Sequence, residues 1–509
     1  MVGQAPHEPE QNRPQQEPAS GERDSRPAPP PQPDQAGAAN EENASAAARG
    51  EIPGNGDATT TGAPPEVDEP GQVPLSHPDR LAQVADTTSP PAPQGRTLPR
   101  WLKIVTPVSL LLGLVFLIAQ VVRPLPSPAL KTEAGLSPYA LAGHFEIPWP
   151  KEGQAAIQME GVGSLGTFGK PKPVPTASVA KVMAAYVLLK EHPLKEDEPG
   201  PMIEVDAKAV QDGQAEHESR IEGLKVGAKF SQQDMMKMLM IPSGNNIARL
   251  LARWDTGTDS ETAFVRKMND AAKQLGMKDT TYTDPSGLDA KTVSTAVDQL
   301  KLAEAVMKFD AFRAIVALPN ATIDGLPEPI NNNNDRLLLA GLSIRGIKTG
   351  SHTAAGGALM WAAYKTIDDK TPLILGTMMD QHVDGPDPNG ANSLILVQDN
   401  SKKVIEAVRN ALTSAVVVKK GQVVGHHDNG LGGRTPLVAT EDLKAIGLPG
   451  QRLALRIVDG GKAVPHTAKA GTEVGTLTIG GGPDATKVPV ALQKDLTEPS
   501  FVSKLTRLG

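Results

Sequence analysis

One stretch limits the possible folds of this chain more than any other: residues 104–122, which read IVTPVSLLLGLVFLIAQVV. The stretch contains no charged residue, and as a helix its roughly 19 residues are long enough to cross the ~30 Å hydrocarbon core of a bilayer. Proline-rich segments flank it on both sides, which disfavours a buried core helix. We therefore predict a transmembrane helix over residues 100–124, in which 104–122 contact the lipid bilayer.

The charges around this helix predict its orientation. Basic residues are slightly denser before it (Arg96, Arg100, Lys103) than after it (Arg123, Lys131). Because positive flanks tend to stay in the cytoplasm, we expect a single-pass protein of the cell membrane with a cytoplasmic N-terminus and an extracytoplasmic C-terminal part. A cleaved signal peptide is disfavoured, since the apolar run begins about a hundred residues into the chain.

The segment before the helix, residues 1–99, is rich in proline, glutamate, glutamine, alanine and glycine and carries an acidic excess. Apolar residues recur in it without a lasting period. Such a segment buries too little apolar surface to offset its ordering entropy, so we expect a disordered tail. The aromatic content of the whole chain, 3%, agrees with a part that does not fold.

Composition excludes several classes of function. The chain has no cysteine, so disulfides, thiolate nucleophiles and cysteine-ligated metals are ruled out. The net charge of −7 comes with no basic face, and we expect no nucleic-acid partner. The adjacent pair His426-His427 lies in a turn-like stretch, and we interpret it as solvated. No metal and no cofactor is expected.

Beyond the apolar run, residues 131–413 mix helical and strand patterns. A hairpin is expected over 155–168, and three strands with short connections are expected over 343–349, 357–365 and 372–379, which favours antiparallel pairing. Helices are expected over residues 177–191, 231–240, 260–275, 295–309 and 404–412. Residues 414–509 contain short β-rich runs separated by glycine and proline, which indicates a small all-β domain without evident chemistry.

Ser178 and Lys181 form the first group with chemical potential. They lie three residues apart at the start of a nearly all-apolar helix, so both side chains share one face. A serine hydroxyl needs a base, and a lysine can be that base when burial lowers its pKa. A charge inside the run VAKVMAAYVLL is costly unless it has a function.

Two further groups follow along the chain. Ser243 and Asn245 alternate in a tight loop after an apolar helix, so both can face one cleft. In the third group, Lys348 and Gly350 share one face of a strand and Thr349 takes the other. The positive charge of Lys348 can attract a carboxylate, and Gly350 permits the close approach of a ligand. The edge of such a strand can also pair with an extended peptide.

Each short motif is common by itself, but Ser-x-x-Lys, Ser-x-Asn and Lys-Thr-Gly in this order are typical of penicillin-binding proteins and class A β-lactamases. With the stretches PTASVAKVMAAYVLL, MLMIPSGNNIARLLA, TTYTDPSGLD and IKTGSHTAAGGALMWAA, residues 131–413 resemble the low-molecular-mass penicillin-binding proteins, the serine D-alanyl-D-alanine carboxypeptidases. The resemblance implies an α/β fold of the α+β kind, the penicillin-recognising serine-transferase fold: a five-stranded antiparallel sheet flanked by helices, here followed by the C-terminal all-β domain.

The resemblance also implies roles. Ser178 would be acylated by peptidoglycan stem peptides ending in D-Ala-D-Ala, with Lys181 as base and Ser243 as proton relay. β-Lactam antibiotics would act as covalent inhibitors at the same serine.

The same resemblance implies the substrate contacts. Asn245 would hold the substrate amide, and Lys348 and Thr349 would bind its carboxylate beside Gly350. The backbone N–H groups of Ser178 and Ser351 would form the oxyanion hole.

Three alternatives stay open at this point. A class A β-lactamase needs a glutamate-activated water, and no Glu-x-x-Leu-Asn-like loop lies between Ser243 and Lys348. A D,D-endopeptidase on crosslinked peptidoglycan would use the same residues, and a non-catalytic cell-wall scaffold would suit the long tail. Candidates for a second carboxylate-binding group are Arg336, Arg345 and the run 331–334.

Overall fold

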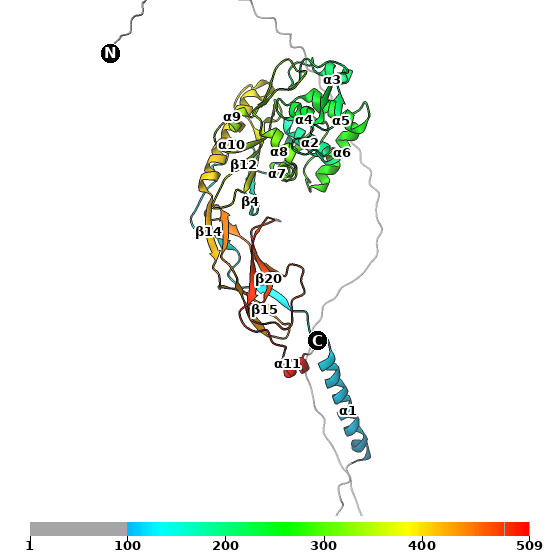
Figure 1. Ribbon diagram of the computed structural model, residues 1–509, viewed down its shortest axis with the longest axis vertical. Coiled ribbons are helices and arrows are strands. Elements are labelled where there is room, and N and C mark those ends of the chain that lie inside the picture. The colour runs from blue at the N-terminus through cyan, green and yellow to red at the C-terminus, as the bar shows by residue number, and fades with distance from the viewer. Residues whose placement is uncertain (1–98, 483, 508–509) are drawn as a thin grey trace, which may run out of the picture. The chain divides into compact units, whose positions relative to one another are not determined.

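The computed structural model describes residues 99–482 and 484–507. The expected disordered tail, residues 1–99, lies outside the described residues except for Pro99. The apolar run forms helix α1 (Arg100–Val122; Figure 1), none of whose residues is buried. With 23 residues and a mean hydropathy of 2.4, α1 is the one described helix long and apolar enough to cross a membrane.

The expected five-stranded antiparallel sheet is confirmed. Its strand order is β11-β12-β13-β3-β4, so a hairpin from early in the chain pairs with three strands that come some 200 residues later. The strands are β3 (Gln154–Met159), β4 (Gly163–Phe168), β11 (Ile344–His352), β12 (Gly356–Tyr364) and β13 (Leu373–Gln381). Strand β11 lies at one edge, which leaves one side of it without a strand partner.

Helices cover both faces of this sheet, as Figure 1 shows for α10 on one side of β12 and the green helices on the other. On one face, α10 (Ala391–Ala411) packs its buried apolar residues against β12 and β13. The other face carries α2 (Ala180–Glu191), α4 (Gln232–Met240), α5 (Asn245–Thr256), α6 (Thr262–Gln274), α7 (Ala296–Val306) and α8 (Asp310–Val316).

The helices expected from the apolar period are present, although α10 already begins at Ala391 instead of near residue 404, and side-chain caps explain where two of them start. Ser231 caps α4 by accepting from the N–H of Asp234, and Thr295 caps α7 by accepting from Asp298. Helix α5 was missed, because Pro242 and Gly244 suggest a turn and the helix begins directly after them.

Several short elements complete this part of the chain. They are the 3-10 turns η1 (Ala177–Val179) and η2 (Pro388–Gly390), the helices α3 (Ala207–Asp212) and α9 (Asp335–Leu338), and the strands β5 (Val174–Pro175), β6 (Met202–Glu204), β7 (Lys229–Ser231), β8 (Val293–Ser294), β9 (Asn320–Ala321) and β10 (Ile330–Asn331).

A second, β-rich region has its own apolar core, as the C-terminal sequence predicts. Its main sheet has the order β1-β15-β16-β21-β20-β19. The strands are β1 (Ala129–Thr132), β15 (Val423–Asp428), β16 (Arg434–Ala439), β19 (Leu455–Val458), β20 (Glu473–Ile479) and β21 (Thr486–Leu492), with the pairs β14 (Thr413–Val418) and β17 (Leu443–Gly447), and β2 (Tyr139–Ala140) and β18 (Arg452–Leu453), and the short helix α11 (Phe501–Leu505).

Two features of this region differ from the sequence-based expectation. Strand β1 pairs with β15, so the segment around residue 131 belongs to the β-rich region instead of starting the catalytic part. His427, expected in a solvated turn, lies on β15 with its side chain fully buried, and its Nε2 lies 3.0 Å from the carbonyl oxygen of Pro465.

Candidate active site

Ser178 and Lys181 lie on one turn at the start of the buried helix. The turn begins as η1 and continues as α2, so the three-residue spacing puts both side chains on one side. Nζ of Lys181 lies 2.8 Å from Oγ of Ser178. The lysine side chain is fully buried, whereas Ser178 is half-buried and reaches the surface of a cleft.

Three oxygen atoms surround the amine of Lys181. Besides Ser178 Oγ, these are Oδ1 of Asn245 at 2.6 Å and the backbone oxygen of Ser286 at 2.9 Å. An uncharged amine has two N–H donors and one lone pair. The amide and peptide oxygens can only accept, so they take the two N–H groups. The lone pair is left for Ser178, whose hydroxyl can donate to it, and this makes Lys181 a base toward that serine.

The surroundings of Lys181 favour the uncharged form that this arrangement needs. Burial lowers the pKa of Lys181 well below its usual value, because the charged amine loses its hydration. Arg249, and Lys348 when it is protonated, act in the same direction, and the carboxylates of Asp284 and Glu218 act against them. The three hydrogen-bond partners of the amine are all neutral groups.

The second motif lies in the short connection between α4 and α5. Ser243 has a φ of 71°, in the left-handed region that non-glycine residues seldom adopt. Its side chain is buried, and among the described residues its Oγ has no hydrogen-bond partner. No described hydrogen bond therefore joins Ser243 to Ser178 or Lys348.

Asn245 is the first residue of α5, and both ends of its side-chain amide are engaged. Oδ1 accepts from Lys181, and Nδ2 donates to Oε2 of Glu218 at 2.6 Å. A carboxylate only accepts, so the two contacts together define which end of the amide faces the lysine.

The third motif lies on the edge strand β11. Lys348 and Gly350 pair with Met360 and Ala358, which belong to the core on the same side of the sheet as α2. Thr349 takes the opposite face, as the strand period predicts. The amine of Lys348 is fully buried and donates to the backbone oxygen of Thr349 at 2.9 Å. Burial lowers the pKa of Lys348 to about 7.

Gly350 is needed for the contact between β11 and the serine turn. A Cβ atom at this position would lie 2.8 Å from the backbone nitrogen of Ser178 and 3.0 Å from that of Val179. The sequence suggested that the glycine makes room for a ligand; in the structure η1 itself occupies that side. The close approach brings Ser351, the next residue of β11, beside Ser178.

A cleft of about 590 Å³ opens at these elements. Of the residues singled out from the sequence, Ser178, Asn245 and Ser351 line it, while Lys181 and Lys348 are buried. The other lining residues are His217, Glu218, Ser219, Gly287, Leu288, Ala290, His352, Thr353, Ala354, Asn389, Ala391 and Leu394. Within residues 99–482 and 484–507, no group of three or more histidine or carboxylate side chains is arranged to hold a metal ion.

Residues 169–382, which include every motif of the cleft, match the family model described as D-alanyl-D-alanine carboxypeptidase. Over this region the chain is similar to the low-molecular-mass penicillin-binding proteins of this family.

Similar proteins carry related names. A D-alanyl-D-alanine endopeptidase of Pseudomonas aeruginosa is 29% identical over 258 residues, which cover 49% of this chain and 78% of that protein. The carboxypeptidase DacC of Escherichia coli is 32% identical over 211 residues, which cover 40% of this chain and 51% of DacC, so the match spans about half of DacC. The solved structure of penicillin-binding protein 5 from Haemophilus influenzae is 18% identical with a TM-score of 0.48, covering 70% of this chain and 100% of that one.

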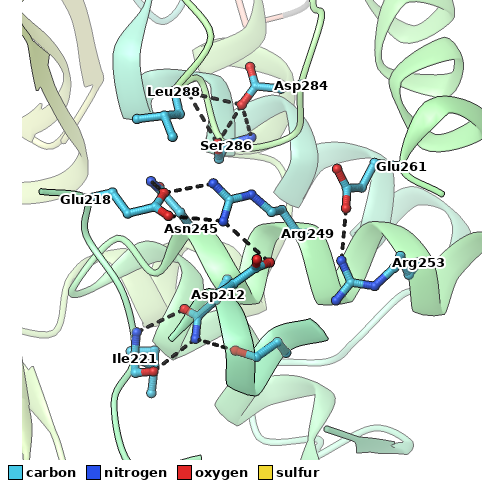
Figure 2. A network of polar contacts seen from close by, with 12 residues as sticks. Asp212, Glu218, Ile221, Asn245, Arg249, Arg253, Glu261, Asp284, Ser286 and Leu288 are labelled. Carbon is cyan, nitrogen blue, oxygen red and sulfur yellow. Dashed lines mark hydrogen bonds and ion pairs between the residues drawn. The ribbon is translucent and has the colours of Figure 1, made fainter. Parts of the chain in front are cut away.

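The chain positions the carbonyl of Ser286 with a side chain that the motifs did not reveal. Oδ2 of Asp284 accepts from the N–H groups of Ser286 and Leu288 and from the Ser286 hydroxyl (Figure 2). These bonds fix the turn so that the Ser286 carbonyl faces Lys181. The Asp-Pro-Ser-Gly sequence predicts such a turn, but not what its carbonyl contacts.

A partly buried ion pair beside Asn245 was also missed. Figure 2 shows Glu218 between Asn245 and Arg249, whose Nη2 donates to Glu218 Oε2 at 2.8 Å and whose Nη1 donates to Oε1 at 3.3 Å. Arg249 lies four residues after Asn245, so prediction of α5 would have placed the two on one helix face. Glu218 comes from the segment after α3, where local sequence gives no signal.

The arginines considered for the substrate carboxylate lie elsewhere. Arg336 forms an ion pair with Asp399 at 3.0 Å, and Arg345 is exposed on β11. Neither lines the cleft. Asn333 instead contacts the loop before Ser243, since its backbone N–H donates to Ile241 O at 3.3 Å.

Proposed function

We propose that this chain is a membrane-anchored serine D-Ala-D-Ala carboxypeptidase, which removes the terminal D-alanine of peptidoglycan stem peptides through an acyl-enzyme at Ser178. One observation carries the proposal: the oxygens of Asn245 and Ser286 occupy the N–H groups of Lys181, so its lone pair is directed at the Ser178 hydroxyl. Similarity to the carboxypeptidase family supports the substrate class.

In the acylation step, Lys181 accepts the proton of Ser178 while Oγ attacks the carbonyl carbon of the penultimate D-alanine. Negative charge then develops on the carbonyl oxygen, and we assign its stabilisation to the backbone N–H groups of Ser178 and Ser351. The close packing of Gly350 against the Ser178 nitrogen supports this pairing, because it brings the two segments together.

The departing D-alanine amine needs a proton, and we assign its delivery to Ser243. A buried hydroxyl without a partner costs roughly 1–3 kcal/mol, so such a group is expected to find its partner in a bound ligand. The hydroxyl can accept from a protonated lysine and donate to the leaving nitrogen.

Recognition of the substrate is assigned to Asn245 and β11. Asn245 has one Nδ2 proton left, which can donate to a substrate carbonyl. The unpaired edge of β11 can pair with an extended peptide, and Lys348 with Thr349 can bind the terminal carboxylate. A bound carboxylate would raise the pKa of Lys348 from about 7 and so restore its charge. β-Lactam antibiotics would acylate the same serine.

We base the proposed location on α1 and its flanking charges. The length and hydropathy of α1 support a single membrane crossing through residues 104–122. The denser basic residues before α1 support a cytoplasmic N-terminus, with the catalytic part outside, where peptidoglycan lies.

The test combines fluorescent penicillin, mass mapping of the adduct and digestion of purified muropeptides. The protein should take up one label on Ser178 and release free D-alanine, and Ser178→Ala should abolish labelling while its melting temperature stays within a degree or two. A labelled Ser178→Ala variant would disprove the assignment. Absence of labelling in the unaltered protein would favour a scaffold, and fast nitrocefin turnover would favour a β-lactamase.

Endopeptidase activity on crosslinked peptidoglycan is the second candidate, favoured by the name of the Pseudomonas aeruginosa relative. The same muropeptide digest separates the two activities. Release of D-alanine from pentapeptide monomers indicates a carboxypeptidase, whereas loss of crosslinked dimers without that release indicates an endopeptidase.

A further inference from the structure

The side-chain amide of Asn245 could face Lys181 in either of two orientations with almost the same shape. In the observed one, Oδ1 accepts an N–H of the lysine at 2.6 Å. In the reverse one, Nδ2 would donate into the lone pair of Lys181, and one lysine N–H would lose its acceptor. The lysine can act on Ser178 only in the first orientation.

Glu218 decides between these orientations. Its Oε2 accepts from Asn245 Nδ2 at 2.6 Å, and its side chain, although it lines the cleft, is only 8% exposed. A carboxylate has no proton to donate. A reversed amide would therefore set Oδ1 against the carboxylate oxygens, which is unfavourable in this partly buried place.

Arg249 in turn holds Glu218. It donates to both carboxylate oxygens, and its Nη1 also lies 3.5 Å from Oδ2 of Asp212. Asn245 and Arg249 are one turn apart on α5, so the helix, the carboxylate and the amide form a closed arrangement (Figure 2). The position of Glu218 is thereby tied to the same helix that carries its target.

We propose that Glu218, held by Arg249, is a positioning residue for the catalytic base: it fixes the amide of Asn245 with its oxygen toward Lys181, and so keeps the lysine lone pair directed at Ser178. The proposal rests on the proposed acyl-enzyme function and explains how its base is kept available.

The pH dependence of acylation gives a second readout, which does not depend on the orientation of the Asn245 amide. The charged groups facing Lys181 are Lys348 from β11, Asp284 from the segment after α6, Arg249 from α5 and Glu218 from the segment after α3. Loss of Glu218 removes a negative charge near Lys181 while Arg249 stays charged beside Asp212, and this lowers the pKa of Lys181 further. Loss of Arg249 leaves Glu218 uncompensated and raises it. The acid limb is the low-pH part of the profile of acylation rate against pH, where Lys181 becomes protonated. The two losses therefore move this limb in opposite directions.

The experiment measures the second-order rate of acylation by fluorescent penicillin with the full chain, from about pH 5 to about pH 10, and the melting temperature of each variant. The variants are Glu218→Met, Glu218→Gln, Arg249→Met and the double variant Glu218→Met/Arg249→Met. Glu261→Met is the matched control. Glu261 forms an ion pair at 2.9 Å with Arg253, which lies on α5 like Arg249, but Glu261 contacts neither Asn245 nor Lys181 (Figure 2). Arg253 keeps its bonds to Asp206 in this control.

We expect Glu218→Met to lower the plateau rate by about tenfold or more, since small misplacements at a reacting centre have effects of this size. Its acid limb moves to lower pH. Glu218→Gln keeps an acceptor oxygen, so most of the plateau returns while the limb stays shifted. Arg249→Met keeps the plateau and moves the limb to higher pH. In the double variant the acid limb returns to its original pH but the plateau rate stays low. Glu261→Met changes neither the limb nor the plateau rate.

The proposal is overturned if Glu218→Met acylates like the unaltered protein, if Glu261→Met loses as much, or if both single losses shift the limb in the same direction. Normal acylation with an accumulating adduct in Glu218→Met also overturns it, because Glu218 would then act in deacylation. Should Arg249→Met not melt cooperatively, the Glu218 variants and the double variant decide. An unaltered protein that takes up no label refutes the proposed function instead.

Discussion

Lys181 occupies a place that is unfavourable for a lysine. Its side chain is fully buried and its hydrogen-bond partners are neutral, so the charged form gains no ion pair in return for its lost hydration. The uncharged form fits the same place well, because two oxygens accept its N–H groups. Burial of the amine therefore costs the fold some stability, and it favours the uncharged form that the proposed role as a base needs.

This predicts opposite effects of Lys181→Met on activity and stability. Acylation by fluorescent penicillin should fall by about 10²- to 10⁴-fold, the usual contribution of a positioned base. The melting temperature at neutral pH should stay equal or rise, since methionine fills similar space without an amine. A variant that is both inactive and clearly less stable would show that the lysine is mainly structural.

Lys348 gives a prediction about pH. Its pKa is about 7 in the folded chain and near 10.5 when unfolded. Between these values the unfolded chain binds a proton that the folded chain does not, so stability rises with pH through this window and is flat below it. Compared with Lys348→Met, the unaltered protein should gain up to about 1.4 kcal/mol in unfolding free energy per pH unit between about pH 7 and pH 10. Denaturant titrations measure this difference, and parallel curves would contradict it.

At the scale of elements, the site depends on how closely β11 approaches η1. The strand carries Lys348 and Ser351, the turn carries Ser178, and only glycine at position 350 lets their backbones meet. The proposed substrate-binding edge and the proposed nucleophile are therefore placed by a single contact between two elements.

Gly350→Ala should separate these elements. The added Cβ would meet backbone atoms at 2.8 and 3.0 Å, which cannot rotate away, so we expect a loss of about 1–3 kcal/mol in stability and at least a tenfold lower acylation rate. Gly481→Ala is the control, because its Cβ would meet Val162 O only at 3.7 Å. Equal behaviour of the two variants in melting and labelling would argue against the packing role.

At the scale of the whole molecule, the path of the chain separates attachment from chemistry. After α1 the chain first adds β1 to the β-rich sheet and only then builds the catalytic sheet. The described catalytic residues all follow residue 170, and none lies on α1.

Removal of residues 1–123 should therefore release an active enzyme. We expect the shortened protein to remain in the supernatant after membranes are sedimented, with unchanged kcat and KM on a soluble D-Ala-D-Ala peptide. A chain lacking only residues 1–97 should sediment with membranes and be equally active. Membrane association of the shorter form would reveal a second attachment, and a large loss of activity in the longer one would reveal a function of the tail.

The sequence by itself determined what depends on local pattern. Uninterrupted apolarity predicts α1, strand and helix periods predict most of the catalytic elements, and the spacing of Ser178 and Lys181 predicts their contact because one helical turn fixes it. The order of the three motifs carried the family assignment, which the family match confirms.

Only the tertiary structure decided the contacts that join distant segments. Nothing near Glu218 in the sequence indicates that its carboxylate orients the amide of Asn245, and nothing near Ser286 indicates that its carbonyl accepts from Lys181. The same holds for the burial of His427 on a strand. Local pattern reports which face of an element is apolar, whereas the partner of a buried polar atom is set by where the whole chain brings its other segments.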